Sequence, residues 1–569
     1  MLAFISRIKQ MDFYKLIDHI HDPSVYELSA QDSPWVEVDT FRMDFSKAEA
    51  PAITEKSPPS PQVEEWQPPR LHNQDRIALK NKIAQSQAQI REEVEATGSM
   101  IIPRTQAQNR KCAATTLEEE QEWRGLVTAE QIKTWRSLLP SLLKRFSKIN
   151  DPRRAESIEH KLTTLMIFGL FAFIFQLHSR REMNRELTGP VIFANLKKIF
   201  PDLETIPHAD TLARLLEKLH PKEIEKVHLG LIKDLLQKKK FKKLLINNRV
   251  PISIDGTQKL FRDGSLNDGH WCEREVGKEG KQQYVYVIEA NISLKNGLTI
   301  PLMTEYLYRD NNQLTNPTGK QDCELTAFER MAERLKKHFP RLKIVLLMDS
   351  LYATQHVMRT CFDNHWDFLI SLPREKMKKL AELLQQEEGT RQSIPEQLYY
   401  RERKQEFYWK NNVTYGDDFD LTLHLAGCLE SYNEVNTETG EIEKHYSSHS
   451  WISSMKFSLK NVHELCNLGA RKKESIEDSI NTEKNRGYHY KHAFSYNWNA
   501  MQGFHYLMRM GHAINALSEF TKKLKQFITK QGCVAILKLI KETLFNPWLS
   551  VEWYEAQLLE CPQLRLYSG

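Results

Sequence analysis

Two hydrophobic runs, each closed by an aspartate, constrain the fold of this chain most strongly. Val-Pro-Ile-Ser-Ile-Asp-Gly-Thr occupies residues 250–257, and Asp255 closes its apolar part. Lys-Ile-Val-Leu-Leu-Met-Asp-Ser occupies residues 343–350, and Asp349 closes it. Short apolar runs rich in Ile and Val predict buried strands. A carboxylate at the end of such a strand lies at the rim of a sheet, so two such strands in one domain can bring two carboxylates together.

The residues around these runs predict a mixed α/β domain. Residues 284–294 alternate between apolar and polar side chains, and residues 298–308 continue after Lys295-Asn296-Gly297. Asn-Gly between two alternating runs predicts a hairpin, because both residues tolerate the positive φ of a type I′ turn. The elements expected next are a helix near 322–338, the strand that ends at Asp349, a helix near 352–363 and a strand at 368–372.

Residues 396–457 interrupt this order. They contain three strand-like runs joined by polar turns such as residues 436–441. These runs are residues 405–414, 421–430 and 450–458. We expect them to form a separate sheet, a β-rich insertion, because helical periodicity returns at about residue 461 and continues almost to residue 545.

Two further segments precede the helical part of the chain. Residues 1–50 show no readable chemistry. Residues 51–105 begin with six prolines among residues 51–70, a composition that opposes both helix and sheet and is typical of a linker. A polar helix is predicted at residues 73–97, with a thin apolar stripe that suits either weak docking or a short coiled coil.

Residues 106–248 predict helices throughout. The expected helices lie near 128–148, 158–177, 190–199, 209–219 and 221–245. Residues 162–177 are nearly all apolar, but a bilayer needs about 20 such residues, so a buried core helix is the better interpretation. The region as a whole is either a DNA-binding module or a helical packing domain without a ligand.

Basic residues gather just before the first aspartate strand. The set comprises Lys238, Lys239, Lys240, Lys242, Lys243 and Arg249. A lysine-rich helix is often only a solvated face. A cationic track also suits the phosphates of a nucleic acid, as does the net charge of +6. Eight cysteines without a CxxC pair fit reduced thiols in a cytoplasm, and no signal peptide is indicated.

Residues 471–488 offer a third acid. On a helix, Glu477, Asn481 and Lys484 share one face at positions i, i+4 and i+7. Two-metal phosphoryl transfer needs several carboxylates around ions roughly 3.5–4 Å apart, and hard oxygen ligands suit Mg²⁺ or Mn²⁺. The competing interpretation is ordinary Glu/Lys pairing on a solvated helix. Asp322 and Glu324 begin another helix, where acids complement the helix dipole.

Three segments together resemble the DDE transposases of bacterial insertion sequences, in particular the insertion sequence four family. "ISIDGT" resembles the strand of the first Asp, and "KQDCELTAFERMAERL" with "LKIVLLMDSLYA" resembles the helix and strand of the second. "ESIEDSINTEKNRGYHYKHAFSYNW" resembles the Glu helix, and "HSRREMNRELTG" resembles an N-terminal stretch of these enzymes. The resemblance covers about residues 160–520.

The resemblance implies an RNase H-like mixed sheet flanked by helices in residues 249–395 and 458–520. The β-rich insertion is residues 396–457, a helical tail is residues 521–569, and residues 106–248 are a helical DNA-binding region.

The resemblance also implies site residues. Asp255, Asp349 and Glu477 would be the catalytic, metal-binding triad. Lys484 matches the Lys of the family signature, while the signature Arg falls on Lys473 and its Tyr on Ala470. Lys keeps the charge of Arg but loses its bidentate fork. Glu474, Asp478 and Glu483 are neighbouring acids, but the spacing to Lys484 favours Glu477.

The implied function is a DNA transposase. It would use Mg²⁺ or Mn²⁺ to cleave double-stranded DNA at transposon ends and to join the ends to target DNA. The implied assembly is at least a homodimer in the bacterial cytoplasm, associated with the nucleoid and not with a membrane. The alternatives are an RNase H-like nuclease without strand transfer and an inactive transposase relative that only binds DNA.

Overall fold

A computed structural model describes residues 73–96, 112, 114–201, 203–263, 270–276, 280–309, 322–372, 392–393, 398–400, 402–415, 421–547, 564 and 566–567. Of these, residues 73–96 and 430–447 belong to one compact unit and the remainder to a second. The expected N-terminal extension (residues 1–50) and the proline-rich segment (residues 51–70) lie outside the described residues.

The core of the second unit is a five-stranded sheet with the order β4-β3-β1-β5-β6. Its strands are β1 (Val250–Asp263), β3 (Gly280–Ser293), β4 (Thr299–Tyr306), β5 (Ile344–Met348) and β6 (Asp367–Ser371). β3 is antiparallel to both β1 and β4, whereas β5 and β6 continue the sheet parallel to β1. This combination of order and direction is RNase H-like, so the predicted fold class is confirmed.

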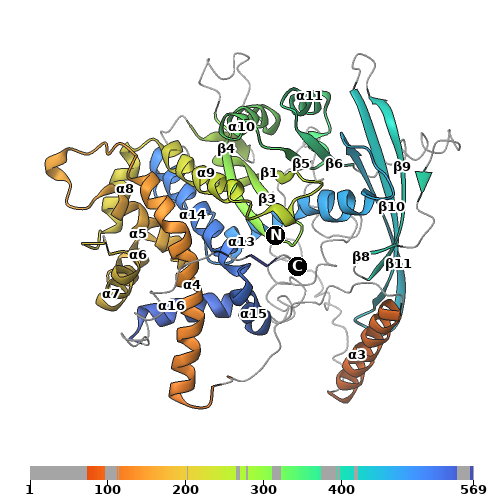
Figure 1. Ribbon diagram of the computed structural model, residues 1–569, viewed down its shortest axis with the longest axis horizontal. Coiled ribbons are helices and arrows are strands. Elements are labelled where there is room, and N and C mark those ends of the chain that lie inside the picture. Colours follow the sequence, from red (N-terminus) through yellow and green to blue (C-terminus); the bar gives the residue numbers. More distant parts are fainter. Residues whose placement is uncertain are drawn as a thin grey trace, which may run out of the picture. The chain divides into compact units, whose positions relative to one another are not determined.

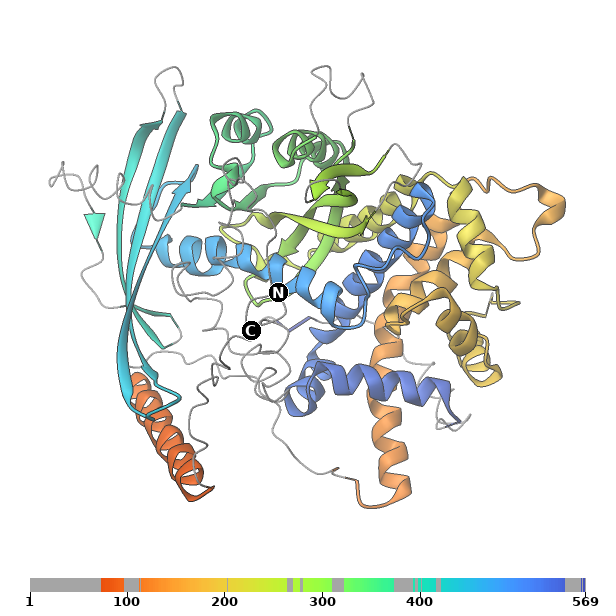
Figure 2. The ribbon, with the colours of Figure 1, turned by 180° about the vertical axis from the view of Figure 1, so that it is seen from behind.

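β5 shows why the sequence forms a central strand here. All five of its residues, Ile344–Met348, are buried. A parallel strand that is covered on both faces reads as a continuous apolar run. α10 (Glu324–His338) and α11 (Gln355–Asp363) cover one face of the sheet, and α13 (Glu474–Asn485) and α14 (Trp498–Glu519) cover the other (Figures 1 and 2).

The predicted insertion is β-rich, but the expectation of a separate sheet is wrong. β9 (Arg403–Tyr415), β10 (Leu421–Val435) and β11 (Ile442–Ser453) extend the core sheet, because β11 pairs antiparallel with β6. The third strand also ends at Ser453, earlier than predicted. Three short strands complete the described sheet: β2 (Cys272–Val276), β7 (Gln392–Ser393) and β8 (Leu398–Tyr400).

The predicted hairpin joins β3 to β4, but its turn is not type I′. Leu294 N–H donates to the carbonyl of Leu298 at 2.9 Å, which closes a three-residue loop. Within that loop only Gly297 has a positive φ, of 86°. A loop of this length needs a single left-handed residue, which Gly supplies without steric cost.

The N-terminal part of the second unit is helical, as predicted. Its helices are α4 (Leu117–Phe146), α5 (Leu162–Ile174), α6 (Arg180–Leu187), α7 (Pro190–Ile199), α8 (Ala209–Lys218) and α9 (Pro221–Gln237). In α5 every residue except Thr163 is buried, and α14 packs along it. The apolar run is therefore a core helix. In the part of the chain that the structure describes, no helix is long and apolar enough to cross a membrane.

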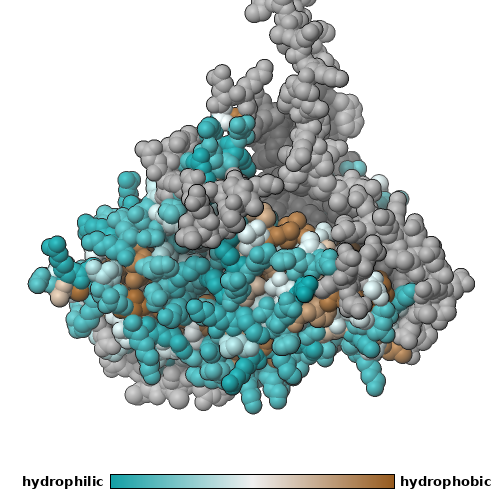
Figure 3. Space-filling model, turned by 90° about the horizontal axis from the view of Figure 1, so that it is seen from above, coloured by the Kyte–Doolittle hydropathy of each residue, from teal (hydrophilic) through white to brown (hydrophobic). Residues whose placement is uncertain are grey.

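The helical pattern predicted from residue 461 to 545 is interrupted at residues 486–497, where Gly487 has a φ of 96°. The helices that follow α14 are α15 (Lys522–Gln531) and α16 (Cys533–Phe545). Figure 3 shows one face of the molecule, on which the coloured residues are mainly hydrophilic and hydrophobic patches are small.

The other unit contains the predicted polar helix and a hairpin tip. The helix is α3 (Asn73–Ala96), whose Ile90 and Val94 are buried. Ser86 donates a hydrogen bond of 2.8 Å to the carbonyl of Gly440 at the tip between β10 and β11. The helix therefore docks on the hairpin, which is one of the two roles expected from its thin apolar stripe.

Candidate active site

The parallel register of β1 and β5 brings the two aspartates to the same edge. Ser253 pairs with Leu347 in the last pair of this ladder, and Asp255 and Asp349 each follow two residues later. Asp255 does not end its strand as predicted, because β1 continues to Asp263 along β3. Beyond Ser253, however, no described strand pairs with β1 on the β5 side, so the edge beside Asp255 is open.

Asp349 turns the chain at the end of β5. Its Oδ1 accepts a hydrogen bond of 2.9 Å from the N–H of Leu351, and this contact caps the 3₁₀ turn η4 (Ser350–Tyr352). The other carboxylate oxygen has no hydrogen-bond partner among the described residues. The capping role that short polar residues often have is therefore compatible with a second role in binding.

α13 lies along the same stretch of β1. The Ser253 hydroxyl donates to the carbonyl of Lys472 at 3.2 Å, just before the helix begins. Lys473 Nζ lies 3.9 Å from Asp255 Oδ1 and also forms an ion pair with Glu477. In the last turn of the helix, Lys484 Nζ donates to the Thr257 hydroxyl at 2.5 Å. Lys473 and Lys484 thus face the first aspartate strand, and Glu477 is linked to it through Lys473.

The site carries more negative than positive charge. The Asp255 side chain is 18% exposed. Burial raises the pKa of Asp255 to about 7, the charge of Lys473 opposes the rise, and the charges of Glu477, Asp349 and Glu324 add to it. Burial lowers the pKa of Lys473, but the charges of Asp255 and Glu477 more than reverse this effect. A partly buried excess of carboxylates is an environment that favours a bound cation.

Glu324 belongs to this acid cluster, which the sequence did not indicate. Its Oε1 accepts a hydrogen bond of 2.6 Å from the Tyr286 hydroxyl, and its Oε2 accepts one of 3.3 Å from Tyr352. A Cβ on Gly256 would lie 2.4 Å from the Glu324 carboxyl carbon. The expected interaction with the helix dipole therefore describes only part of what Glu324 does. Asp322 instead pairs with Arg330 at 2.6 Å.

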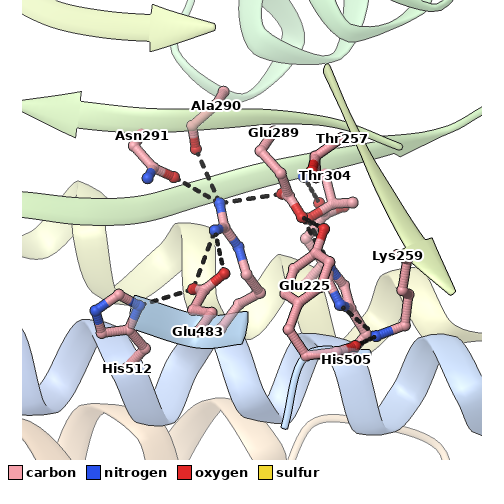
Figure 4. A network of polar contacts seen from close by, with 12 residues as sticks. Glu225, Thr257, Lys259, Glu289, Ala290, Asn291, Thr304, Glu483, His505 and His512 are labelled. Atoms are coloured by element: carbon pink, nitrogen blue, oxygen red, sulfur yellow. Dashed lines mark hydrogen bonds and ion pairs between the residues drawn. The ribbon is translucent and has the colours of Figure 1, made fainter. Parts of the chain in front are cut away.

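Glu483 cannot replace Glu477, because it is fully buried in a separate network. Arg509 Nη1 donates to both carboxylate oxygens of Glu483 at 3.1 Å, and His512 Nδ1 lies 2.7 Å from Oε1. Arg509 Nη2 lies 3.1 Å from Glu289 Oε2 on β3. Figure 4 shows Glu483, His512 and Glu289, which come from α13, α14 and β3. Arg509 therefore fastens α13 to the sheet. Glu474 and Asp478 are exposed, as Glu477 is, so burial excludes only Glu483 from the role proposed for Glu477.

The basic set predicted to bind DNA divides into two groups. Lys238, Lys239, Lys242 and Lys243 are exposed at the end of α9 and in the following turn. Lys240 Nζ instead donates to the carbonyl of Leu564 at 3.0 Å, and Arg249 forms an ion pair with Asp367. Four of the six side chains are thus available to a partner, while the other two hold the fold together.

The donor set fits a hard divalent cation. Carboxylate oxygens are the ligands that Mg²⁺ and Mn²⁺ prefer. Among the described residues, no group of three or more His, Cys, Asp or Glu side chains is already arranged to hold a metal ion. The Lys473 ammonium lies between Asp255 and Glu477, where its positive charge balances part of the negative charge of these carboxylates.

Two protein families match the chain. The family described as Transposase DDE domain matches residues 268–512, and the family described as DDE_Tnp_1-associated matches residues 143–232. The first range includes Asp349 and Glu477 and begins after Asp255. No curated protein matches the chain.

Proposed function

We propose that this protein is a DNA transposase of the insertion sequence four type, because residues 268–512 match the family described as Transposase DDE domain and residues 143–232 match its associated family. It cleaves DNA at transposon ends and joins the ends to target DNA. The observation that carries the proposal is the register of β1 and β5. This register brings Asp255 and Asp349 to one open edge, beside the helix that carries Glu477.

Asp255, Asp349 and Glu477 would hold Mg²⁺ or Mn²⁺. When bound, such an ion activates the attacking oxygen of water or of a DNA 3′-hydroxyl and stabilises the leaving oxygen. The half-exposed Glu477 side chain can turn toward the edge, since within the described part of the chain its ion pair with Lys473 is the one contact that holds it. Asp255 lies within β1, and Asp349 lies between β5 and the turn η4, so the backbones of both residues are fixed before DNA binds.

The two lysines would serve the DNA backbone. Lys473 is 7% exposed and forms ion pairs with both Asp255 and Glu477 in the free protein. If Asp255 and Glu477 were to hold a cation in place of Lys473, the Lys473 ammonium would be free to contact a phosphate oxygen of the scissile strand. Lys484 lies on the same face of α13 and is held by Thr257, so it can contact a neighbouring phosphate.

The wider DNA surface would come from the helical region. Lys238, Lys239, Lys242 and Lys243 supply exposed cations just before β1. Such contacts position a duplex without reading its sequence. Joining two transposon ends requires two copies of the site, so the active complex would be at least a homodimer. In a bacterial cell it would act in the cytoplasm on nucleoid DNA.

The test is a cleavage assay with duplex DNA that carries the sequences flanking the gene, in the presence of Mg²⁺. Wild type is expected to cut at the element ends and to join them to a target plasmid. Asp349→Asn should lose cleavage by on the order of a hundredfold or more, and Asn can still accept the hydrogen bond of Leu351. Glu329→Gln, on the exposed side of α10, is the control.

Three outcomes separate the alternatives. No cleavage by wild type under these conditions, or equal cleavage by Asp349→Asn, contradicts the proposal. Cleavage without joined products favours the nuclease. Binding of the end sequences without cleavage favours the inactive relative.

A further inference from the structure

We propose that Glu324 is a fourth carboxylate of the acid site, which positions Asp255 and Asp349 and strengthens cation binding through its charge. The inference deepens the proposed function and rests on it. Glu324 comes from the first turn of α10, on the face of the sheet opposite α13. It therefore approaches the open edge of β1 from the side that Glu477 does not occupy.

Two tyrosines hold the Glu324 carboxylate in place. Tyr286 belongs to β3, and its hydroxyl donates to Oε1 at 2.6 Å. Tyr352 belongs to the turn that Asp349 caps, and its hydroxyl donates to Oε2 at 3.3 Å. One side chain thus links the strand next to β1 with the turn that carries Asp349.

The contact with β1 requires a glycine. Gly256 directly follows Asp255, and a Cβ at this position would lie 2.4–2.5 Å from three atoms of the Glu324 carboxyl group. The carboxyl group therefore rests on the backbone beside Asp255. A larger residue at position 256 would displace this carboxyl group. Glu324 can therefore occupy its position only because residue 256 is a glycine.

The charge of Glu324 is not neutralised by a basic side chain among the described residues. Its two hydrogen bonds come from neutral hydroxyl groups. Other acids at or near the start of α10 differ: Asp322 pairs with Arg330 at 2.6 Å, and Glu329 lies 2.7 Å from His356. An uncompensated carboxylate beside two others adds to the attraction for a divalent cation. Because both of its oxygens are already engaged, Glu324 acts as a positioning residue and not as a ligand.

The test measures Mn²⁺ binding by isothermal titration calorimetry, with the full chain and without DNA. Glu324→Gln keeps the size of the side chain and can still bond both hydroxyls, so its melting temperature should match wild type. Its dissociation constant for Mn²⁺ should rise by about tenfold. In cleavage assays it should need more Mn²⁺ for half-maximal rate and reach a rate near that of wild type at saturation. Glu329→Gln should bind Mn²⁺ like wild type.

Several results would overturn the inference. Wild-type Mn²⁺ affinity in Glu324→Gln is one of them. If Glu324→Gln lowers the melting temperature, Glu324→Asp decides, because it retains the charge. An affinity of Glu324→Asp for Mn²⁺ close to that of wild type supports the inference. A loss of affinity as large as in Glu324→Gln contradicts it. The proposed function fails separately, if wild type does not bind Mn²⁺ or if Asp349→Asn binds it equally well.

Discussion

Ser253 on β1 pairs with Leu347 on β5 in parallel register, and each stands two residues before an aspartate of the proposed site. This pairing places Asp255 and Asp349 at the same edge of the sheet. A slip of one residue would turn one of the two carboxylates to the opposite face of the sheet. The site therefore depends on the packing of the buried segments at residues 250–254 and Ile344–Met348 and not on the loops around them.

Gly256→Ala should impair the site without unfolding the protein. The new methyl group would meet the Glu324 carboxyl group at 2.4 Å, so Glu324 must move away from Asp255. We expect weaker Mn²⁺ binding and slower cleavage, measured by calorimetry and by a gel assay. Gly189→Ala is the matched control, since its nearest neighbouring atom would lie at 3.6 Å. Equal behaviour of the two variants would contradict the close contact.

Arg509→Met should destabilise the protein strongly. It leaves the buried carboxylates of Glu483 and Glu289 without their guanidinium partner. Breaking a buried pair in this way costs about 3–5 kcal/mol of unfolding free energy. Lys161→Met removes an exposed pair with Glu204 and should cost less than about 1 kcal/mol. Denaturant titration measures both values, and similar costs would show that Arg509 does not hold α13 to the sheet.

His228 should make the stability fall in acid. Its Nε2 lies 2.7 Å from the Pro301 carbonyl, while its buried Nδ1 has no hydrogen-bond partner among the described residues. Burial lowers the pKa of His228 to about 4; the contact with Pro301 opposes this shift and the charge of Arg509 adds to it.

Between pH 6.5 and about 4, the unfolded chain therefore binds a proton at His228 that the folded chain does not. His228 should therefore contribute a loss of stability of about 1.4 kcal/mol per pH unit over this range as pH decreases. His228→Gln cannot bind this proton. Its free energy of unfolding, measured by denaturant titration at several pH values, should therefore depend less steeply on pH. Parallel curves for the two proteins would refute the assignment.

The four exposed lysines before β1 should set the salt dependence of DNA binding. Replacing Lys238, Lys239, Lys242 and Lys243 together by Gln removes up to four phosphate contacts. The slope of log affinity against log salt should become shallower by about 3–4. Fluorescence anisotropy with a labelled duplex at several salt concentrations measures the slope. An unchanged slope would mean that this segment is only a solvated surface.

Much of the fold could be predicted because its signals are local. The apolar run of β5, the Asn-Gly hairpin and the amphipathic periodicity of α10 each lie within one short segment. The pairing of β11 with β6 could not be predicted in the same way, because it joins residues about 80 positions apart that carry no matching local pattern. This is why the insertion was expected to form its own sheet.

The candidate site could be predicted only in part, for a similar reason. Asp255 and Asp349 end apolar runs, and this pattern marked them. Glu324 depends on the absence of a side chain at Gly256 and on tyrosines from two other elements. Arg509 did leave a signal, since a lone Arg in the apolar sequence of α14 is typical of a buried ion pair.

Anomalous X-ray diffraction from crystals grown with Mn²⁺ tests most directly whether Asp255, Asp349 and Glu477 form one metal site. We expect an anomalous peak at about 2.0–2.6 Å from a carboxylate oxygen of each of these residues, with Lys473 Nζ displaced from between Asp255 and Glu477. A map without a peak at this edge of the sheet, with Lys473 still bound to both carboxylates at saturating Mn²⁺, would contradict it.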